Sequence, residues 1–492
     1  MFFSIINIGD VMENIEEIVK RLKKDTNNVE DITYRKKEVC KKDIYIIYNE
    51  SLTGSDKISD FIVRSLDKIN RLNKKKDLLK IITNDIDNFK YKEITTYEDL
   101  AYYLNYGFTI ILIESSPKAL VLETKRDLAR SISTPQTEVS LRASMDAFVE
   151  DMQTNLGLIR RRIKDNNLWI KSNEIGKYTK TKVNILYINT ICKEEYVNKV
   201  EEKLKTIDID GIITCGTIKN LIEKENKSVF PTMISTERPD RVSRALLQGK
   251  IVIMVDSCPF ALILPICLND LFLSVEDAYS KSINISMTRI IRYMAFFITL
   301  LTPALYIAVT TYNQEMLPTQ LLISFASQRS TVPFPAFVEA IIMMAAFEIL
   351  RECDLRLPTF TTSALSIVGA LILGEAAVNA GIVSPIMIIV IAITAVSALL
   401  FTEPEIINGV RWYRLVFMLG ANFLGIFGVM ITFIYFITKL ASLESFGLPF
   451  LYPVAPTSIA GLKNSIIKFP TKDLEKREEL LSDNITKYKE VK

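Results

Sequence analysis

Two acidic side chains interrupt an apolar stretch of the sequence in which water would be scarce. The stretch FPAFVEAIIMMAAFEILRE covers residues 334–352 and contains Glu339 and Glu348. A charged group is costly at the centre of a membrane, so it must face protein, water or another charge. Such carboxylates could belong to a polar pore, a vestibule or an element that couples two parts of the protein.

The spacing of these two acids places them on different faces of a helix. A helix turns by about 100° per residue, so Glu339 and Glu348 point in nearly opposite directions. Glu348 shares a face with Glu352 and has Arg351 three positions away, which predicts a charge cluster at the end of the segment. Glu339 stands alone. Both acids could equally lie in the interfacial zone with water or arginine partners.

The apolar segment 363–383 carries a second set of polar and small residues. Glu375 and Asn379 are four residues apart and share a face that lipid cannot solvate. In a homo-oligomer Glu375 would repeat as a ring, a device that admits cations; the alternative is an arginine partner in the same chain. Small residues on another face allow close helix packing and predict a seam made of Ala370, Gly374, Ala377 and Gly381.

Two arginine-rich motifs lie in the polar half of the chain. Residues 144–164 are expected to form a helix that ends in Arg160, Arg161 and Arg162. Cations stabilise a helix C-terminus, but arginine also forms forked pairs with carboxylates of a partner or a neighbouring subunit. The motif TERPDRV (236–242) favours local ion pairs, with subunit coupling as the alternative, among Glu237, Arg238, Asp240 and Arg241.

Composition excludes several classes of protein. The net charge of +3 is spread over the chain and shows no nucleic-acid footprint. The chain has no histidine, and its six cysteines show no metal-ligand spacing, so we expect no metal, no cofactor and no enzyme activity. No nucleophile–base pair stands out. Cys258 and Cys267 lie in apolar stretches and are expected to be core residues.

The polar half, residues 1–289, shows two α/β blocks. In the first, residues 43–49 form a predicted strand, 57–72 a predicted helix, and 108–115 with 118–124 a predicted hairpin. The second begins near Thr181. Its order of strand 182–190, helix 193–207, strand 210–216 and helix 218–225 favours parallel pairing, and two further strands are predicted at 249–257 and 260–266.

The apolar half contains five candidate membrane segments. They cover residues 290–312, 334–350, 363–383, 385–402 and 415–438. The start of the chain does not resemble a signal peptide, so residues 1–289 are expected in the cytosol, and the basic tail predicts a cytosolic C-terminus. Because two cytosolic ends require an even number of crossings, one segment must be interfacial or re-entrant. The short segment 334–350 is the natural suspect, although the arginines that follow it suit a true span.

The predicted fold is therefore an α/β cytosolic N-terminal region of two subdomains followed by an all-α, multi-pass membrane domain. We expect an N-terminal α/β subdomain at 1–122, a helical connector with the arginine cluster at 123–180 and a second α/β subdomain at 181–285. A transmembrane helical domain should cover 286–440, and a polar basic tail 441–492.

Several motifs in this order resemble the A subunits of GerA-type spore germinant receptors. They are ETK, PQTE, LIRRRI, FPT, TERPDRV, VPFP, LRE.D.RLP and GALILGEAAV.AGIVS, and they extend from about Glu123 to Pro456. The chain departs from the family pattern at Arg142-Ala143-Ser144 and at Asp256-Ser257. These departures concern details of the soluble region.

The resemblance implies a role in spore germination. Such A subunits lie in the spore inner membrane of Firmicutes, with the N-terminal domain on the core side, and act with a transporter-like B subunit and a lipoprotein C subunit. The resemblance implies that they assemble, as pentamers, into ligand-gated channels for monovalent cations. A SpoVAF-like amplifying paralog and a non-conducting coupling scaffold remain alternatives. A solute transporter fits less well, because the apolar half shows no internal repeat.

Overall fold

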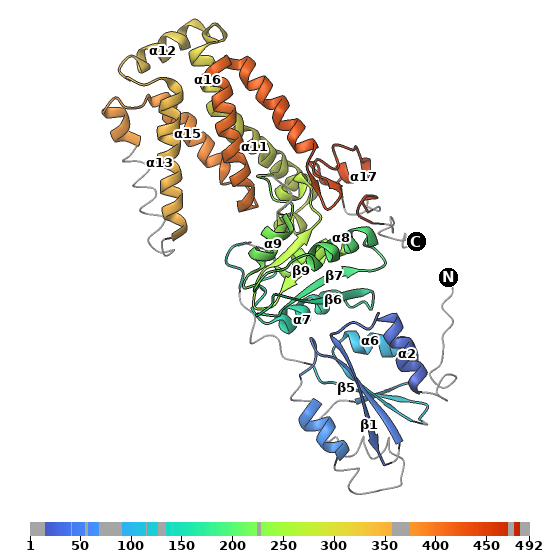
Figure 1. Ribbon diagram of the computed structural model, residues 1–492. Helices are drawn as coiled ribbons and strands as arrows, with labels where there is room; N and C mark the ends of the chain where they lie inside the picture. The colour runs from blue at the N-terminus through green and yellow to red at the C-terminus, as the bar shows by residue number, and fades with distance from the viewer. Residues whose placement is uncertain are drawn as a thin grey trace.

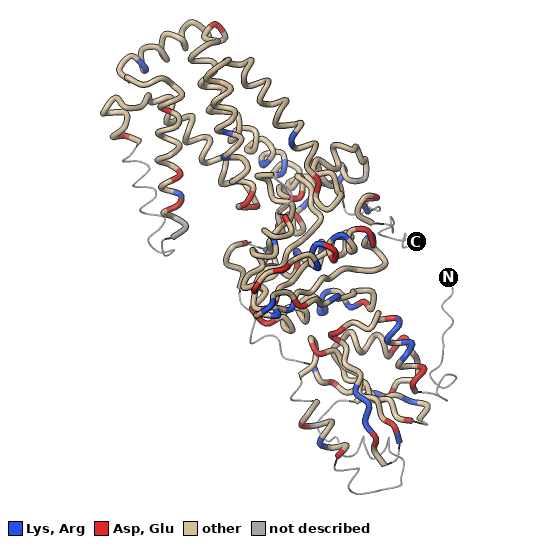
Figure 2. Tube along the Cα trace, viewed as in Figure 1, with Lys and Arg blue, Asp and Glu red and all other residues tan. Residues whose placement is uncertain are grey.

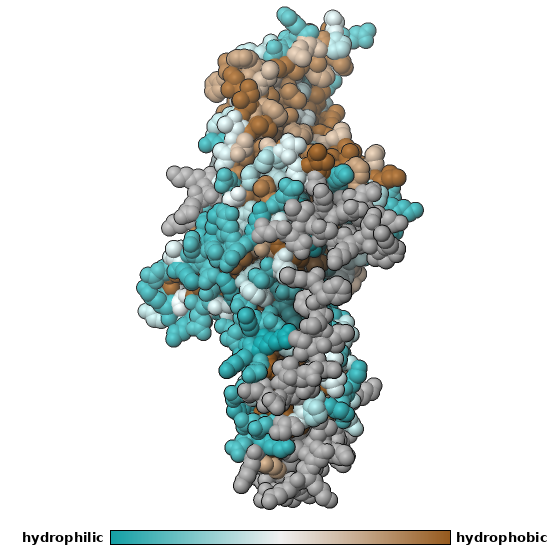
Figure 3. Space-filling model, turned by 90° about the vertical axis from the view of Figure 1, so that its right-hand side faces the viewer, coloured by the Kyte–Doolittle hydropathy of each residue, from teal (hydrophilic) through white to brown (hydrophobic). Residues whose placement is uncertain are grey.

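A computed structural model gives the arrangement of the chain (Figure 1). It describes residues 15–40, 42–54, 58–67, 91–114, 116–125, 134–138, 140, 142–223, 228–356, 374–470 and 477–482. Two α/β units and a helical bundle follow one another along an elongated molecule. Charged residues crowd the two α/β units and are sparse in the bundle (Figure 2). The surface changes accordingly from hydrophilic to hydrophobic (Figure 3).

The first α/β unit contains a five-stranded sheet in the order β1-β2-β4-β5-β3, and its described pairs are antiparallel. Side chains of β4 alternate between two cores: Ile110 and Leu112 face helices α2 and α6, whereas Ile111 and Ile113 face the helical turn η1. The elements are α2 (Ile15–Asp25), β1 (Ile32–Val39), β2 (Lys42–Asn49), η1 (Ile58–Val63), β3 (Tyr91–Ile94), α6 (Tyr97–Asn105), β4 (Thr109–Ile113) and β5 (Ala119–Leu122).

The second α/β unit repeats this strand order as β6-β7-β9-β10-β8. Side chains of β9 again alternate: Ile251 and Ile253 face helices α8 and α9, whereas Val252 and Met254 join a core that continues into the bundle. The elements are α7 (Met152–Arg162), β6 (Leu168–Ile175), β7 (Thr181–Ile188), α8 (Glu194–Lys205), α9 (Cys215–Glu223), β8 (Ile234–Thr236), α10 (Pro239–Leu247), β9 (Ile251–Val255) and β10 (Ala261–Leu264).

Four expectations for the polar half are wrong. Residues 210–214 form no strand, and the described pairs of the second sheet are antiparallel rather than parallel. Ile213 of this segment is 78% exposed. The prediction failed because a short apolar run does not by itself identify a strand. Strand β6 belongs to the second sheet although it lies in the predicted connector 123–180. The helix expected over 144–164 begins only at Met152, where Asp151 caps it by accepting the N–H of Thr154.

The helical bundle follows two short 3-10 turns, η3 (Leu268–Phe272) and η4 (Val275–Ala278). Its elements are α11 (Ser282–Thr311), η5 (Gln314–Met316), α12 (Thr319–Arg329), α13 (Ala336–Arg356), α15 (Pro385–Ala398) and α16 (Pro404–Ala441). Residues 374–379 are also helical. Among the described residues, α11 and α16 are long and apolar enough to cross a membrane. Helix α13 is longer than the segment expected at 334–350, since it continues through its charged end, but it is not among the helices that are apolar enough to span.

The segment predicted as a single span over 415–438 contains a reversal. Gly425 in α16 has φ +61° and ψ −140°, a conformation that glycine adopts without a Cβ clash. The side chain of Asn313 accepts the N–H of Ile426 at 3.1 Å and holds the turn. Beyond it the chain runs back along the first part of α16, which brings the ring centroids of Tyr413 and Phe436 to within 4.7 Å. Residues 404–424 and 426–441 are thus two antiparallel arms.

The reversal returns the chain to the second α/β unit. Ser445 Oγ donates to the carbonyl of Thr232 at 2.7 Å and accepts the N–H of Ile266 at 3.0 Å. The short strands β11 (Glu444–Ser445) and β12 (Leu448–Pro449) and helix α17 (Ile459–Leu462) follow. The chain therefore enters and leaves the bundle on the same side. The predicted tail 441–492 is in part built into the fold, since Leu481 is buried in the core of the second unit.

Candidate functional site: the junction between the second α/β unit and the bundle

Arg241 joins the second α/β unit to the start of helix α16. It lies in the first turn of α10, which begins at Pro239. Its guanidinium pairs with Glu403, the residue that precedes α16, and Nη1 lies 3.1 Å from Glu138 Oε2. Both Arg241 and Glu403 have few exposed atoms. A buried charge that loses its partner is strongly destabilising, so this contact links the two regions firmly.

Burial also changes the protonation of this pair. It raises the pKa of Glu403 to about 7, with Arg241 opposing the shift and Glu138 adding to it. Burial alone would lower the pKa of Arg241, but the charges of Glu403 and Glu138 outweigh it and raise the pKa. Arg241 therefore stays charged, and Glu403 is the member of the cluster that exchanges a proton near neutrality.

A second polar contact and an aromatic contact also join the second α/β unit to the first arm of α16. Lys219 of α9 pairs with Glu405 and donates to the carbonyl of Met233 at 3.0 Å. The ring of Phe230 stacks on Tyr413 with centroids 5.7 Å apart. A Cβ at Gly409 would lie 2.7 Å from that ring, so α16 must carry a glycine there for Phe230 to fit. Phe230 is 3% exposed and belongs to the core that includes the bundle.

The other members of TERPDRV hold neighbouring backbone rather than the bundle. Arg238 and Asp240 form the local ion pair at 3.0 Å that the spacing favours. Arg238 also donates to the carbonyls of Glu138 and Ser144. Glu237 accepts the N–H groups of Thr137 and Glu138. The motif thus fastens the segment that carries Glu138, the second partner of Arg241.

The three arginines at the end of α7 have three different environments. Arg160 is buried and forms a forked pair with Asp31 of the first α/β unit, with Nε 3.0 Å and Nη2 3.2 Å from the carboxylate oxygens. Arg162 pairs with Asp146 at 2.5 Å and donates to the carbonyl of Leu158. Arg161 is exposed and has no ion pair within the described residues. The helix end thus carries one tie between the two α/β units.

Both acids of the opening motif have partners in their own chain. Glu339 is completely buried at the start of α13; it accepts the N–H and the hydroxyl of Ser384 at 3.0 and 2.9 Å, and Arg329 Nε lies 3.5 Å away. It does not stand alone as expected, because the chain brings α12 and α15 to it. Glu348 pairs with Arg351 at 3.1 Å and with Arg411 at 3.0 Å, and Arg414 lies 3.6 Å away.

Glu375 and Asn379 have the opposite environment. Both are exposed on helical residues 374–379, and neither has a hydrogen bond or ion pair within the part of the chain that the structure describes. Of the predicted seam, Ala370 lies outside the described residues. Gly374 is buried against Ile388 of α15, and Ala377 packs on the core.

Gly381 does not belong to a packing seam. It has φ +66° and ends the helix, with its N–H bonded to the carbonyl of Val378 and the N–H of Ile382 bonded to that of Ala377. This pair of bonds is a Schellman motif, which a left-handed glycine completes. The small residue at this position is required by the turn.

Several residues of the junction escaped the sequence reasoning. Glu403 and Glu405 could have been found, because the segment Thr402–Glu405 places two acids between two apolar runs. Lys219 carries no such signal, since it is one lysine among many on an amphipathic helix. Only the tertiary structure reveals that it faces Glu405.

The fold and the junction define a class of protein: two α/β units of one topology, the second locked to an apolar helical bundle by buried ion pairs. Within the described residues no group of three or more His, Cys, Asp or Glu could hold a metal ion. The chain belongs to the GerA family, described as Bacillus/Clostridium GerA spore germination proteins, whose pattern matches residues 20–480.

Relatives of known name agree with this family. Spore germination protein KA of Bacillus subtilis is 38% identical over 477 residues, which cover 96% of this chain and 87% of the relative. Spore germination protein GerLA of Bacillus cereus is 33% identical and covers 99% of this chain and 100% of its own length. The predicted resemblance to A subunits of germinant receptors is confirmed.

One solved structure is also similar. It is the N-terminal domain of the A subunit of the Bacillus megaterium spore germinant receptor GerK3, with 31% identity and a TM-score of 0.43. The match covers 54% of this chain and 98% of that one.

Proposed function

We propose that this protein is the A subunit of a nutrient germinant receptor of the spore membrane, and that copies of it assemble into a cation channel. The observation that carries the proposal is the exposure of Glu375 and Asn379 without a partner among the described residues. They lie on a helix packed into an apolar bundle, where a lone carboxylate is costly. In a ring of subunits the same carboxylates would line a wet passage and attract cations.

The path of the chain supports an orientation for this assembly. The bundle begins at Ser282 and ends at Ala441 beside the second α/β unit, so both flanking regions lie on one side. With the α/β units on the core side of the spore inner membrane, the helices would cross an even number of times. If each arm of α16 spans the membrane, the turn at Gly425 would add the crossing that the sequence count lacked.

The junction gives this channel a route for control. A nutrient signal from a transporter-like B subunit, with a lipoprotein C subunit as third partner, would change how the helices pack. Arg241, Lys219 and Phe230 would transmit such a change between α16 and the second α/β unit, because all three contact the first arm. The protein has no catalytic step in this scheme.

Substitution of Glu375 tests the channel. We expect Glu375→Gln to reduce the rate of cation release from germinating spores by about tenfold, equivalent to about 1.4 kcal/mol in the barrier. Cation efflux is recorded after addition of nutrient, with receptor abundance checked by immunoblot. The control is Glu315→Gln, an exposed acid in η5 outside the apolar helices, which should leave efflux unchanged. Wild-type efflux and selectivity in Glu375→Gln would remove this residue from the pore.

A second candidate function is a coupling scaffold that passes a signal to another pore. It is favoured by Glu339 and Glu348, because both acids are satisfied within their own chain and are not available to line a passage. Reconstitution of the purified chain in liposomes separates the two functions. A cation flux that Glu375→Gln reduces supports the channel, whereas the absence of flux with and without partner subunits supports the scaffold.

A further inference from the structure

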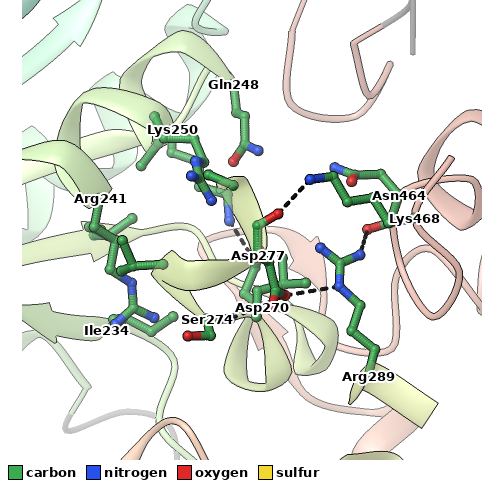
Figure 4. Close-up of a pocket in the computed structure, with 16 residues that line it drawn as sticks. Ile234, Arg241, Gln248, Lys250, Asp270, Ser274, Asp277, Arg289, Asn464 and Lys468 are labelled. Atoms are coloured by element: carbon green, nitrogen blue, oxygen red, sulfur yellow. Dashed lines mark hydrogen bonds and ion pairs between the residues drawn. The ribbon is translucent and has the colours of Figure 1, made fainter. Parts of the chain in front are cut away.

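A cavity lies where the second α/β unit, the start of α11 and the C-terminal segment meet. Its volume is about 300 Å³, and its walls come from α10, from η3 and η4, from the first turns of α11 and from residues 464–468 (Figure 4). Figure 4 shows Arg289 of α11 and Lys468 of the C-terminal segment pointing toward Asp277 of η4. A volume of this size is at the lower end of the range of small-molecule sites.

The lining of this cavity is strongly cationic. Its described residues include two carboxylates, Asp270 and Asp277. The lining also contains five cations: Arg241, Arg244, Lys250, Arg289 and Lys468. Arg241 already pairs with Glu138 and Glu403 outside the lining, so the remaining four cations exceed the two carboxylates by two. The chain as a whole has a net charge of only +3, so this wall is a marked concentration of charge.

Both carboxylates are already engaged. Asp270 pairs with Lys250 at 2.6 Å, with both side chains buried. Asp277 serves two guanidinium groups, Arg289 at 2.9 Å and Arg292 at 3.1 Å. Neither acid is free to neutralise a further cation.

Two cations of the lining therefore lack a carboxylate partner. Arg244 has no side-chain hydrogen bond or ion pair to any described residue, and Lys468 Nζ donates only to the backbone carbonyl of Asp277. Burial lowers the pKa of Arg244, and burial together with Arg289 and Arg244 lowers that of Lys468. The fold thus holds two partly buried cations close enough to repel each other, and an anion between them would relieve that repulsion.

We propose that this cavity binds a phosphate group between the Arg244 guanidinium and the Lys468 ammonium. Guanidinium donors fit phosphate oxygens in a forked geometry, and a lysine adds a point charge. The group could come from an anionic lipid headgroup or from a soluble phosphate. The proposal does not depend on ion conduction.

The surface beside the cavity favours the lipid source. Arg289 lies on the first turns of α11, which is apolar and long enough to cross a membrane. Lys468 of the lining is itself flanked by the exposed apolar side chains of Ile466, Ile467 and Phe469. A basic pocket flanked by apolar side chains at the start of such a helix has the arrangement that holds a lipid headgroup at the membrane surface.

The test compares binding to the full-length protein in neutral detergent. One arm adds mixed micelles of phosphatidylglycerol, with phosphatidylcholine as reference, and the other adds inorganic phosphate. Each arm is read as the shift in melting temperature and as an apparent Kd. We expect phosphatidylglycerol to raise the melting temperature and Arg244→Gln to weaken its binding about tenfold, the loss of one charge-assisted contact. A response to inorganic phosphate that Arg244→Gln weakens would support the site and assign it to a soluble ligand.

Two further variants keep this test decisive. Arg161→Gln removes an exposed cation elsewhere and should bind as the wild type does. Lys468→Gln removes the second cation of the site and should weaken binding even if Arg244→Gln fails to fold. Equal binding by the wild type, Arg244→Gln and Lys468→Gln, or no response to either anion, would overturn the proposal.

Discussion

The two α/β units have one topology and two different attachments. The first unit covers both faces of its sheet with its own elements, α2 and α6 on one side and η1 on the other. The second unit covers one face with α8 and α9, while the core on its other face continues through α7 and α10 into the bundle. The same strand order therefore serves as a self-contained domain in one copy and as the base of the helices in the other.

This difference indicates which parts of the molecule are coupled tightly and which are coupled weakly. Among the described residues, the first unit contacts the second through the buried pair of Asp31 and Arg160, through Asn105, which donates to Asn166, and through the apolar side chain of Val29. The second unit shares apolar core and buried charges with α16. We therefore expect the second unit and the bundle to move as one body, and the first unit to be the part that can be released.

The largest effect should follow loss of the buried ion pair between the two units. Arg160→Ala leaves Asp31 buried without its cation, and we expect the attachment of the first unit to weaken by about 3–5 kcal/mol. Hydrogen exchange of the full chain in detergent should then speed up around Asp31 and at the end of α7, and leave α16 unchanged.

The neighbouring arginine provides the control. Arg161→Ala removes an exposed side chain from the same helix end and should change stability by less than about 0.5 kcal/mol. If both variants exchanged alike, the forked pair would not be what holds the first unit.

A smaller effect is expected where the second unit meets the bundle. Phe230→Leu keeps most of the buried volume but loses the ring contacts with Tyr413 and Phe436, which should cost about 1.5 kcal/mol. Exchange should speed up in α16, since its first arm loses the partner that fills the space at Gly409.

The matched change in the first unit is Phe108→Leu, whose ring contacts Tyr103 at 5.2 Å within that unit. It should loosen the first sheet and leave α16 unaffected. Faster exchange of α16 in Phe108→Leu would mean that the two units are coupled more tightly than their contacts indicate.

The last effect concerns pH at the junction. Burial raises the pKa of Glu403 from its ordinary value of 4.5 to about 7, in an environment set by Arg241, Glu138 and Glu405. The folded protein thus holds a proton that the unfolded chain releases between these values. The stabilisation is complete below about pH 4.5 and is lost as the pH rises toward and through 7.

Glu403→Gln mimics the protonated form and should remove this dependence. We expect the melting temperature of the variant, relative to the wild type, to rise between pH 5 and pH 8, flanking the pKa of about 7. Glu444→Gln, an exposed acid near the other end of α16, should follow the wild type. Parallel curves for Glu403→Gln and the wild type would show that Glu403 does not titrate in this range.

Much of the secondary structure could be predicted from the local pattern of apolar residues. The strands at β2, β4, β5, β7, β9 and β10 and the helices α8 and α9 lie where apolar periodicity predicts them. The hairpin of β4 and β5 is confirmed by its antiparallel register. The repeated strand order went unnoticed, because β3, β6 and β8 are edge strands whose partly exposed residues carry a weak apolar signal.

The candidate site could be predicted from the sequence only in part. TERPDRV was singled out, and the structure separates its locally paired Arg238 from Arg241, which contacts the bundle. Nothing in the local spacing distinguishes the two arginines, since each has an acid within a few residues. Their roles differ because α10 presents them to different neighbours.

The sequence by itself determined the family, the division into polar and apolar halves, and most of the elements, because these follow from motifs and from periodicity within a few turns. Only the tertiary structure decided that α16 folds back at Gly425, where Asn313 from a distant segment accepts the N–H of the turn. It likewise decided that Glu339 is satisfied by Arg329 and Ser384. A charge in an apolar segment shows that a partner is needed, but the partner is chosen by packing between segments far apart in the chain.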